Sequence, residues 1–203
     1  MIGILDYNMN NLTCVKSSID YLGFKSKIVK YPKKIDEVDK IILPGVGAFG
    51  DAIKNLKNKG MIEALHDSVI IKKKPFLGIC LGAQLVCKES DEHGQNSGFG
   101  WFDKKVEKLI SKKTFRVPHN GWNNITVNNK NSLLLKNINN DSLFYFNHSH
   151  AIDESSLDCV SASCNHVIKF AAVIEKNNIF AVQFHPEKSQ KDGLTLIKNF
   201  LTM

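Results

Sequence analysis

The sequence predicts an α/β fold with a central, mostly parallel sheet flanked by helices. Up to Ser90, short apolar runs alternate with amphipathic stretches, and turns rich in glycine or proline separate them. Strands that alternate with helices are typical of a parallel sheet covered on both faces. After Ser90 the sequence becomes polar and glycine-rich and then carries several short strand-like runs. These runs predict an additional antiparallel portion in the C-terminal half.

The elements of the N-terminal half are predicted in order from their patterns. An apolar run at the start predicts a buried strand, and Leu12, Val15, Ile19 and Leu22 then recur at helical spacing until Gly23. Strands are predicted at residues 1–7, 24–29, 40–43 and 75–79, and a second helical stretch at 52–73 with a break near Gly60. Residues 44–47, which contain a proline and two glycines, are predicted to form the loop that follows the third strand.

The C-terminal half is predicted to hold strands and one closing helix. Strands are expected at residues 105–110, 124–127, 143–148, 168–174 and 179–184. The closing helix is indicated by the spacing of Leu194, Ile197, Phe200 and Leu201. No linker or internal repeat interrupts the chain. A length of 203 residues suits one domain that buries a sizeable core without disulfides, so residues 1–203 are expected to form a single domain.

Composition excludes several classes of protein. The net charge is +7, but all but one of the 27 basic residues are lysines, the exception being Arg116. Arginine is the usual bidentate reader of bases and phosphates, so we do not expect nucleic acid binding. No apolar run is long enough to span a bilayer, and the first residues do not resemble a signal peptide. Five cysteines without paired spacing favour free thiols. We therefore expect a cytoplasmic protein with no membrane attachment.

Cys80 lies in a segment with the form of a nucleophile elbow, Gly78-Ile79-Cys80-Leu81-Gly82. The flanking glycines remove the Cβ clashes that a sharp turn from strand to helix would create. A cysteine in this turn is exposed at a helix N-terminus, where unsatisfied N–H groups favour the thiolate. The alternative interpretation is a small buried residue that ends a strand.

His185 and Glu187 are the second candidate pair. Residues two apart on an extended segment point the same way, and Pro186 is expected to hold the segment extended at the end of a strand. His185 could then exchange protons with Cys80, while Glu187 fixes its tautomer and stabilises the imidazolium. A catalytic triad is therefore predicted from residues far apart in the sequence.

The glycine-rich loop at residues 44–47 is the third candidate element. Backbone N–H groups of Val46 and Gly47 could stabilise a developing oxyanion, and the N–H of Leu81 could add another donor. Phosphate binding is less well supported, because the Gly-Lys-Ser/Thr ending of a P-loop is absent.

These motifs occur in an order that resembles the triad-type glutamine amidotransferases, which have a flavodoxin-like sheet. Five segments narrow the resemblance to the glutaminase subunit of imidazole glycerol phosphate synthase, and together they cover essentially the whole chain. These segments are residues 1–7 with Asn11, 43–49, 117–123, 145–149 and 182–190. The fold implied is that of the class I glutamine amidotransferases.

The resemblance also implies a glutamine-binding set. In the family, glutamine lies between the elbow and the oxyanion loop, which carries over to Gly47 and Gln84, and Glu92 is placed to pair with the substrate ammonium. His148, Ser149 and His150 match the segment whose backbone N–H groups hold the substrate carboxylate. His148 and His150 are also spaced like metal ligands, but no third ligand supports a metal site.

The implied reaction is hydrolysis of L-glutamine to glutamate and ammonia without a cofactor. The family delivers ammonia to a (β/α)8-barrel cyclase partner that makes imidazole glycerol phosphate in histidine biosynthesis. The family's glutaminase is nearly silent alone, and Gly45 and Gly47 would let the oxyanion loop reorient when the partner docks.

Some positions depart from that subfamily. They are Ala83, Cys87, Trp101, Asn120, Asn147 and His150. Trp101 and His150 resemble a paralogous set that supplies ammonia for the amidation of surface sugars. A different class, a triad hydrolase of another substrate, would share the elbow and the base but should lack the glutamine-binding set.

Overall fold

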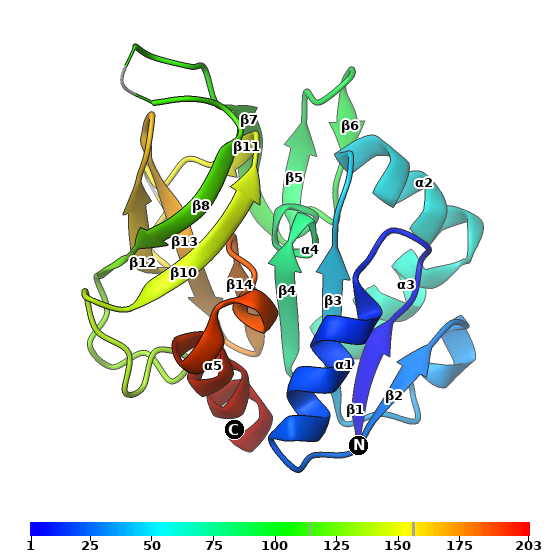
Figure 1. Cartoon of the computed structure of the whole chain (residues 1–203). Helices are drawn as coiled ribbons and strands as arrows, with labels where there is room; N and C mark the ends of the chain where they lie inside the picture. Colours follow the sequence, from blue (N-terminus) through cyan, green and yellow to red (C-terminus); the bar gives the residue numbers. More distant parts are fainter. Residues whose placement is uncertain (114, 156) are drawn as a thin grey trace.

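The computed structural model describes residues 1–113, 115–155 and 157–203, and a large twisted sheet forms its centre (Figure 1). The strand order is β2-β1-β3-β4-β14-β13-β12-β9. The first five strands are parallel, and the last three continue the sheet with antiparallel pairing. Their bounds are β2 Ser26–Val29, β1 Ile2–Leu5, β3 Lys40–Gly45, β4 Phe76–Cys80, β14 Ile179–Val182, β13 Lys169–Lys176, β12 Val160–Asn165 and β9 Thr126–Val127. The parallel half has the order of flavodoxin-like sheets, which confirms the predicted fold class.

Helices cover both faces of the parallel half, as the alternating pattern predicted. Apolar residues of α1 and α5 share one core with β1 and β4, whereas those of α2 and α3 share a second core with β3 on the opposite face. Figure 1 shows α1 and α5 side by side on the near face. The helices are α1 Leu12–Tyr21, α2 Phe49–Asn58, α3 Met61–His66, α4 Leu81–Gln84 and α5 Gln190–Thr202, with shorter turns η1 Pro32–Lys34, η2 Asp67–Ile71 and η3 Pro186–Lys188.

The C-terminal half adds two small sheets. One has the order β11-β7-β5-β6 and the other pairs β10 with β8. Their bounds are β5 Cys87–Ser90, β6 Asn96–Ser97, β7 Phe102–Lys108, β8 His119–Asn124, β10 Leu143–His148 and β11 His150–Ile152. The β8–β10 ribbon buries Phe144 and Phe146, and Phe144 stacks on Phe184 with ring centroids 4.0 Å apart. This stacking fixes the ribbon close to the end of β14.

The predicted elements are present, but their bounds differ by up to three residues at several places, β8 was predicted only at its last residue, and four further strands were missed. The strands β5, β6, β11 and β12 were not predicted. β12 is buried from Ser161 to Cys164, but these small residues are not the large apolar or β-branched residues that usually mark a buried strand. The pattern therefore gave no signal for it. Residues 124–127 were predicted as one strand but are split between β8 and β9, and β7 begins and ends before the predicted range. β3 continues through Pro44 and Gly45, so the loop after it is shorter than predicted.

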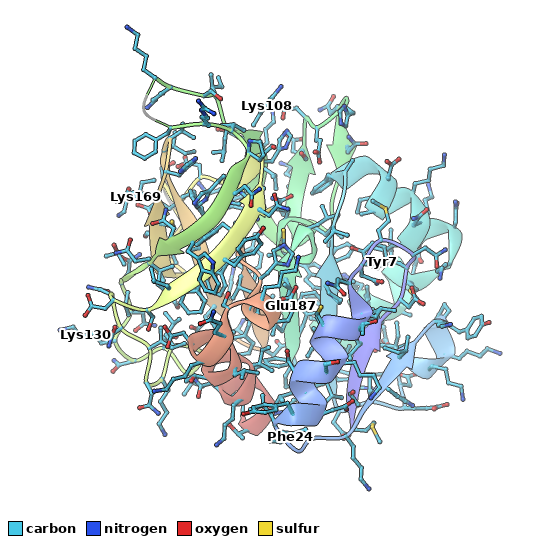
Figure 2. The ribbon with its side chains drawn as sticks, in the orientation of Figure 1. Tyr7, Phe24, Lys108, Lys130, Lys169 and Glu187 are labelled. Atoms are coloured by element: carbon cyan, nitrogen blue, oxygen red, sulfur yellow. The ribbon has the colours of Figure 1, made fainter. Side chains whose placement is uncertain are left out.

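The charged surface agrees with the composition. Lys108, Lys130 and Lys169 are exposed, and Figure 2 places them along the outside of the half formed by the C-terminal strands. No helix in the described part of the chain is long and apolar enough to cross a bilayer.

Three neighbouring strands bring the predicted site together. β3, β4 and β14 are parallel and adjacent, with β4 in the middle. Gly45 pairs with Cys80 in the register of β3 and β4, and Val182 of β14 pairs with Ile79. The carboxyl ends of these strands therefore lie at one edge, which is where open α/β sheets bind their ligands.

Candidate active site

Cys80 occupies the sharp turn between β4 and α4. Its backbone has φ 53° and ψ −109°, a conformation that residues other than glycine seldom adopt. A Cβ on Gly82 would overlap the carbonyl oxygen of Leu43, and one on Gly78 would lie 2.5 Å from the carbonyl oxygen of Gly82. The predicted sharp turn is therefore present, and its glycines are required by the close approach of backbone to backbone. The predicted exposure of Cys80 was wrong, because the side chain is only 6% exposed.

His185 and Glu187 form a buried pair beside this turn. His185 Nδ1 lies 2.8 Å from Glu187 Oε1, and both side chains are almost completely inaccessible to solvent. The predicted reason for this pairing was wrong, because Pro186 begins the 3-10 turn η3 and does not hold the segment extended. His185 itself is extended, and the turn after it brings the carboxylate back to the imidazole. With Nδ1 bonded to Glu187, Nε2 is the nitrogen left for proton exchange.

The charges around His185 favour its protonated form. Burial alone would lower the pKa of His185, but the charge of Cys80 and its contact with the imidazole, together with the hydrogen bond and charge of Glu187, raise it above the ordinary value. Cys80 and Glu187 together therefore favour the imidazolium form of His185. This is the arrangement that a cysteine nucleophile requires.

A small pocket of about 130 Å³ lies over the Cys80 thiol. Its volume is below the ~300–1,000 Å³ typical of pockets for drug-sized ligands, so it suits a small substrate. The lining residues are Val46, Gly47, Cys80, Leu81, Gln84, Glu92, Asn147, His148, Ser149, His150, His185 and Lys188. Every residue predicted from the sequence for the site lines this pocket except Glu187, which lies behind His185.

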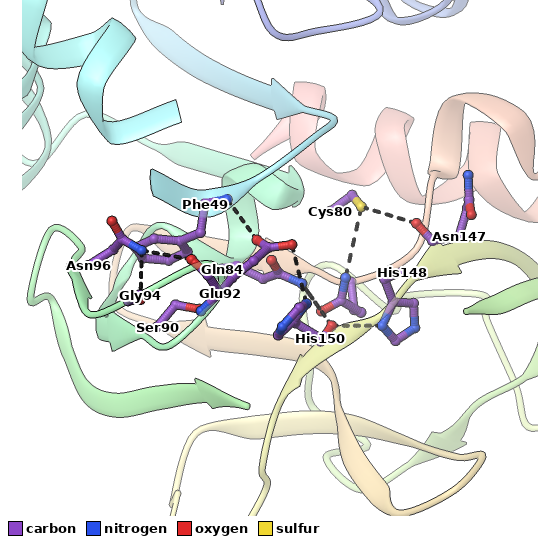
Figure 3. A network of polar contacts seen from close by, with 11 residues as sticks. Phe49, Cys80, Gln84, Ser90, Glu92, Gly94, Asn96, Asn147, His148 and His150 are labelled. Carbon is purple, nitrogen blue, oxygen red and sulfur yellow. Dashed lines mark hydrogen bonds and ion pairs between the residues drawn. The ribbon is translucent and has the colours of Figure 1, made fainter. Parts of the chain in front are cut away.

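Gln84 and Glu92 lie next to each other in the pocket, and both contact His150 (Figure 3). Gln84 Nε2 donates to the carbonyl oxygen of His150 at 2.8 Å, so this side chain anchors the segment from Asn147 to His150. Glu92 Oε2 accepts the backbone N–H of Phe49 at 2.7 Å, and its Oε1 lies 3.4 Å from His150 Nδ1. The Glu92 carboxylate thus faces the pocket from a fixed position at the start of α2.

His148 is held by hydrogen bonds on both ring nitrogens. Its Nδ1 lies 2.8 Å from the carbonyl oxygen of His150 and therefore carries a proton, which leaves Nε2 to accept from His119 Nδ1 at 3.0 Å. His119 Nε2 then accepts from the Asn123 amide at 3.3 Å. The sequence spacing did not indicate this contact with His119. No group of three metal-ligating side chains occurs in the described ranges.

The loop between β3 and α2 carries two of the three predicted oxyanion donors. The backbone N–H of Val46 donates to the carbonyl oxygen of Met9 at 3.0 Å. Gly47 follows with φ 104°, a backbone conformation that strongly favours glycine. The Val46 donor is thus occupied in this structure. Leu81 lies at the start of α4, where N–H groups have no acceptor within the helix.

Three residues of the site were not assigned from the sequence. Gln183 Nε2 lies 3.9 Å from Cys80 Sγ, and its Oε1 accepts from Gln84 Nε2 at 3.1 Å. The carbonyl oxygen of Asn147 lies 4.0 Å from Cys80 Sγ, and Lys188 lines the pocket. A polar Gln183 at the end of an otherwise apolar strand, two residues before His185, was the signal that could have identified it.

The chain is similar to known proteins over nearly its whole length. The family model for glutamine amidotransferase class-I matches residues 3–203. Imidazole glycerol phosphate synthase subunit HisH 1 of Campylobacter jejuni (strain 81-176) is 44% identical over 98% of both chains. Subunit HisH of Caldanaerobacter subterraneus is also 44% identical, over 98% of this chain and 97% of its own. The solved structure of PurLQS from Thermotoga maritima shares the fold, with a TM-score of 0.78 at 18% identity over 99% of this chain and 97% of its own. The chain belongs to the class-I glutamine amidotransferases and, within them, to the HisH subunits of imidazole glycerol phosphate synthase.

Proposed function

We propose that this chain hydrolyses L-glutamine to glutamate and ammonia with Cys80 as nucleophile, His185 as acid and base, and Glu187 as the group that orients His185. The observation that carries the proposal is the elbow cysteine over a small pocket with the buried His185–Glu187 pair beside it. No cofactor takes part in the proposed reaction.

The reaction takes place in two halves at the same carbon. The Cys80 thiolate attacks the carboxamide carbon of glutamine, and the oxyanion is stabilised by N–H groups of Leu81 and of the Val46–Gly47 loop. His185 gives its proton to the leaving nitrogen, so ammonia departs and a γ-glutamyl thioester remains. His185 then takes a proton from water, which attacks the thioester and releases glutamate and the thiolate.

The pocket supplies complementary groups for the amino-acid end of glutamine. We assign Glu92 to the substrate ammonium, because its carboxylate is fixed toward the pocket. Backbone N–H groups of His148, Ser149 and His150 are assigned to the substrate carboxylate, with Gln84 holding this segment in place. Gly47 closes the pocket on the loop side. A triad hydrolase of another substrate would not need this set.

Labelling of Cys80 tests the proposal. A glutamine-analogue electrophile should modify the wild-type chain at Cys80 in the presence of the partner, and Cys80→Ala should abolish the labelling. Cys87→Ala is the matched control, because Cys87 is fully buried and burial raises the pKa of its thiol to about 12. This variant should be labelled like the wild type. Absence of Cys80 labelling in the assembled complex would rule out the glutaminase function.

We further propose that the ammonia passes to a (β/α)8-barrel cyclase subunit in a cytoplasmic heterodimer, which makes imidazole glycerol phosphate in histidine biosynthesis. The subunit names of the relatives support a partner. The occupied Val46 N–H supports an enzyme that is slow until the partner reorients the oxyanion loop.

A pull-down of the native partner tests the identity of the acceptor enzyme. A cyclase recovered alone with this chain supports the histidine pathway. A cyclase accompanied by a sugar-amidating synthetase would instead support the paralogous function, in which the ammonia serves the amidation of a surface sugar.

A further inference from the structure

Tyr7 carries a buried hydroxyl that the proposed mechanism does not use. The side chain is completely inaccessible to solvent, and its oxygen has no hydrogen-bond partner among the residues that the structure describes. A buried hydroxyl normally finds a partner, because leaving it without one costs free energy. Its position therefore calls for a functional explanation.

The Tyr7 hydroxyl lies between the oxyanion loop and the nucleophile elbow. Tyr7 belongs to the segment that follows β1 (Figure 2). A Cβ on Gly45 would overlap the Tyr7 oxygen and would also lie 2.8 Å from Leu81 Cβ and 2.9 Å from Gly82 N. The hydroxyl thus contacts the last residue of β3, immediately before Val46.

The surroundings keep this hydroxyl protonated. Burial and, to a smaller extent, the charge of Cys80 raise the pKa of Tyr7 above its ordinary value. A protonated phenol is a hydrogen-bond donor. Tyr7 therefore offers a donor with no acceptor in the present conformation of the loop.

Rotation of the Gly45–Val46 peptide would create an acceptor for it. The Val46 N–H now donates to Met9 O, so it must turn away from Met9 before it can stabilise an oxyanion. Because a peptide unit is planar, the same rotation turns the Gly45 carbonyl toward the side that the N–H has left. Met9 O cannot donate to that carbonyl. Tyr7, two residues before Met9 and in contact with Gly45, can.

We propose that Tyr7 is a positioning residue whose hydroxyl donates to the Gly45 carbonyl when the Gly45–Val46 peptide rotates, and so stabilises the active form of the oxyanion loop. This inference rests on the proposed glutaminase function and names the donor that its loop requires.

The substitution Tyr7→Phe tests the inference, because it removes only the hydroxyl. In the complex with the co-purified partner, kcat for glutamine should fall about tenfold, as expected for one lost hydrogen bond, with KM unchanged. The melting temperature of the free chain should not fall, since the hydroxyl has no partner there. Tyr21→Phe removes the same group from a side chain that is 78% exposed, and it should leave kcat unchanged.

Other outcomes would overturn the inference. An unchanged kcat in Tyr7→Phe would do so, and a lower melting temperature would mean that the hydroxyl is already bonded in the resting form. A changed pH dependence of Cys80 alkylation by iodoacetamide in the free Tyr7→Phe chain would show that Tyr7 acts on the thiolate instead. If the wild-type complex did not hydrolyse glutamine, the proposed function itself would fail. If the wild-type complex were active and Tyr7→Phe had the same kcat, only the role of Tyr7 would fail.

Discussion

The backbone N–H of Val46 donates to the carbonyl oxygen of Met9 over 3.0 Å, in a loop where both Val46 and Gly47 are exposed. One such hydrogen bond contributes only about 0.5–1.5 kcal/mol net. A partner that docks on the exposed loop can offset this amount with a few contacts. The loop therefore has the energetics of a two-state element whose balance a partner can shift.

Gly47→Ala is expected to impair the loop itself. An alanine at φ 104° is strained, and its Cβ would lie 2.7 Å from the Met9 methyl group. We expect kcat in the partner complex to fall about 10²–10³-fold, the usual effect of losing one oxyanion donor. Gly23→Ala is the control, because Gly23 also has a positive φ, 81°, but nothing lies near its Cβ position. It should lower the melting temperature and leave kcat unchanged, and equal kcat losses in both variants would contradict the assignment.

Glu187→Gln tests whether Glu187 acts through its negative charge or only by orienting the His185 ring. The amide can still bond to the imidazole, but it no longer stabilises the imidazolium, so the pKa of His185 should move down toward its ordinary value. By analogy with other triads, kcat should fall by up to about 10⁴-fold with little change in KM. Steady-state kinetics of the complex measure this, with the exposed Glu63→Gln on α3 as control. A loss of less than about threefold would show that Glu187 is structural.

The buried histidines predict how stability depends on pH. Burial and the neighbouring His148 and His166 lower the pKa of His119 to about 3, and burial lowers that of His148 to about 4. Between these values and about 6.5 the unfolded chain binds more protons than the folded one. The contribution of these two neutral rings to the free energy of unfolding is therefore complete above about pH 6.5 and is lost as the pH falls.

Urea unfolding between pH 7 and pH 4 measures this dependence. In this pH range, each of the two histidines should make the free energy of unfolding fall by up to about 1.4 kcal/mol for each unit that the pH is lowered. His119→Gln should reduce the slope, whereas His66→Gln, at an exposed position, should not change it. A slope unaffected by His119→Gln would mean that this ring is protonated in the folded chain.

The sequence predicted those parts of the fold and site that depend on local chemistry. Glycines around Cys80 determine a turn that only small residues allow, and the alternating pattern of the first half determines a parallel sheet. The β12 strand was missed because its burial depends on neighbouring strands and not on its own serines and alanines. The His119–His148 bond was missed because it is created by the pairing of β8 with β10. Gln183 was missed because its role depends on Gln84, far away in the sequence.

Glu92→Gln should weaken substrate binding and leave the chemical steps intact. The side-chain amide oxygen introduced at position 92 can still accept the Phe49 N–H, so the start of α2 should keep its position, but the negative charge proposed to pair with the substrate ammonium is lost. Hydrogen bonds to charged groups contribute about 1.5–3 kcal/mol, which corresponds to a KM about 10–100-fold higher with kcat little changed. Asp91→Asn is the matched control, because Asp91 is adjacent in the chain but pairs with Lys105 outside the pocket. Its KM should equal that of the wild type. If Glu92→Gln lowered kcat and left KM unchanged, Glu92 would act on the reacting end of the substrate, and the ammonium would have to bind elsewhere in the pocket.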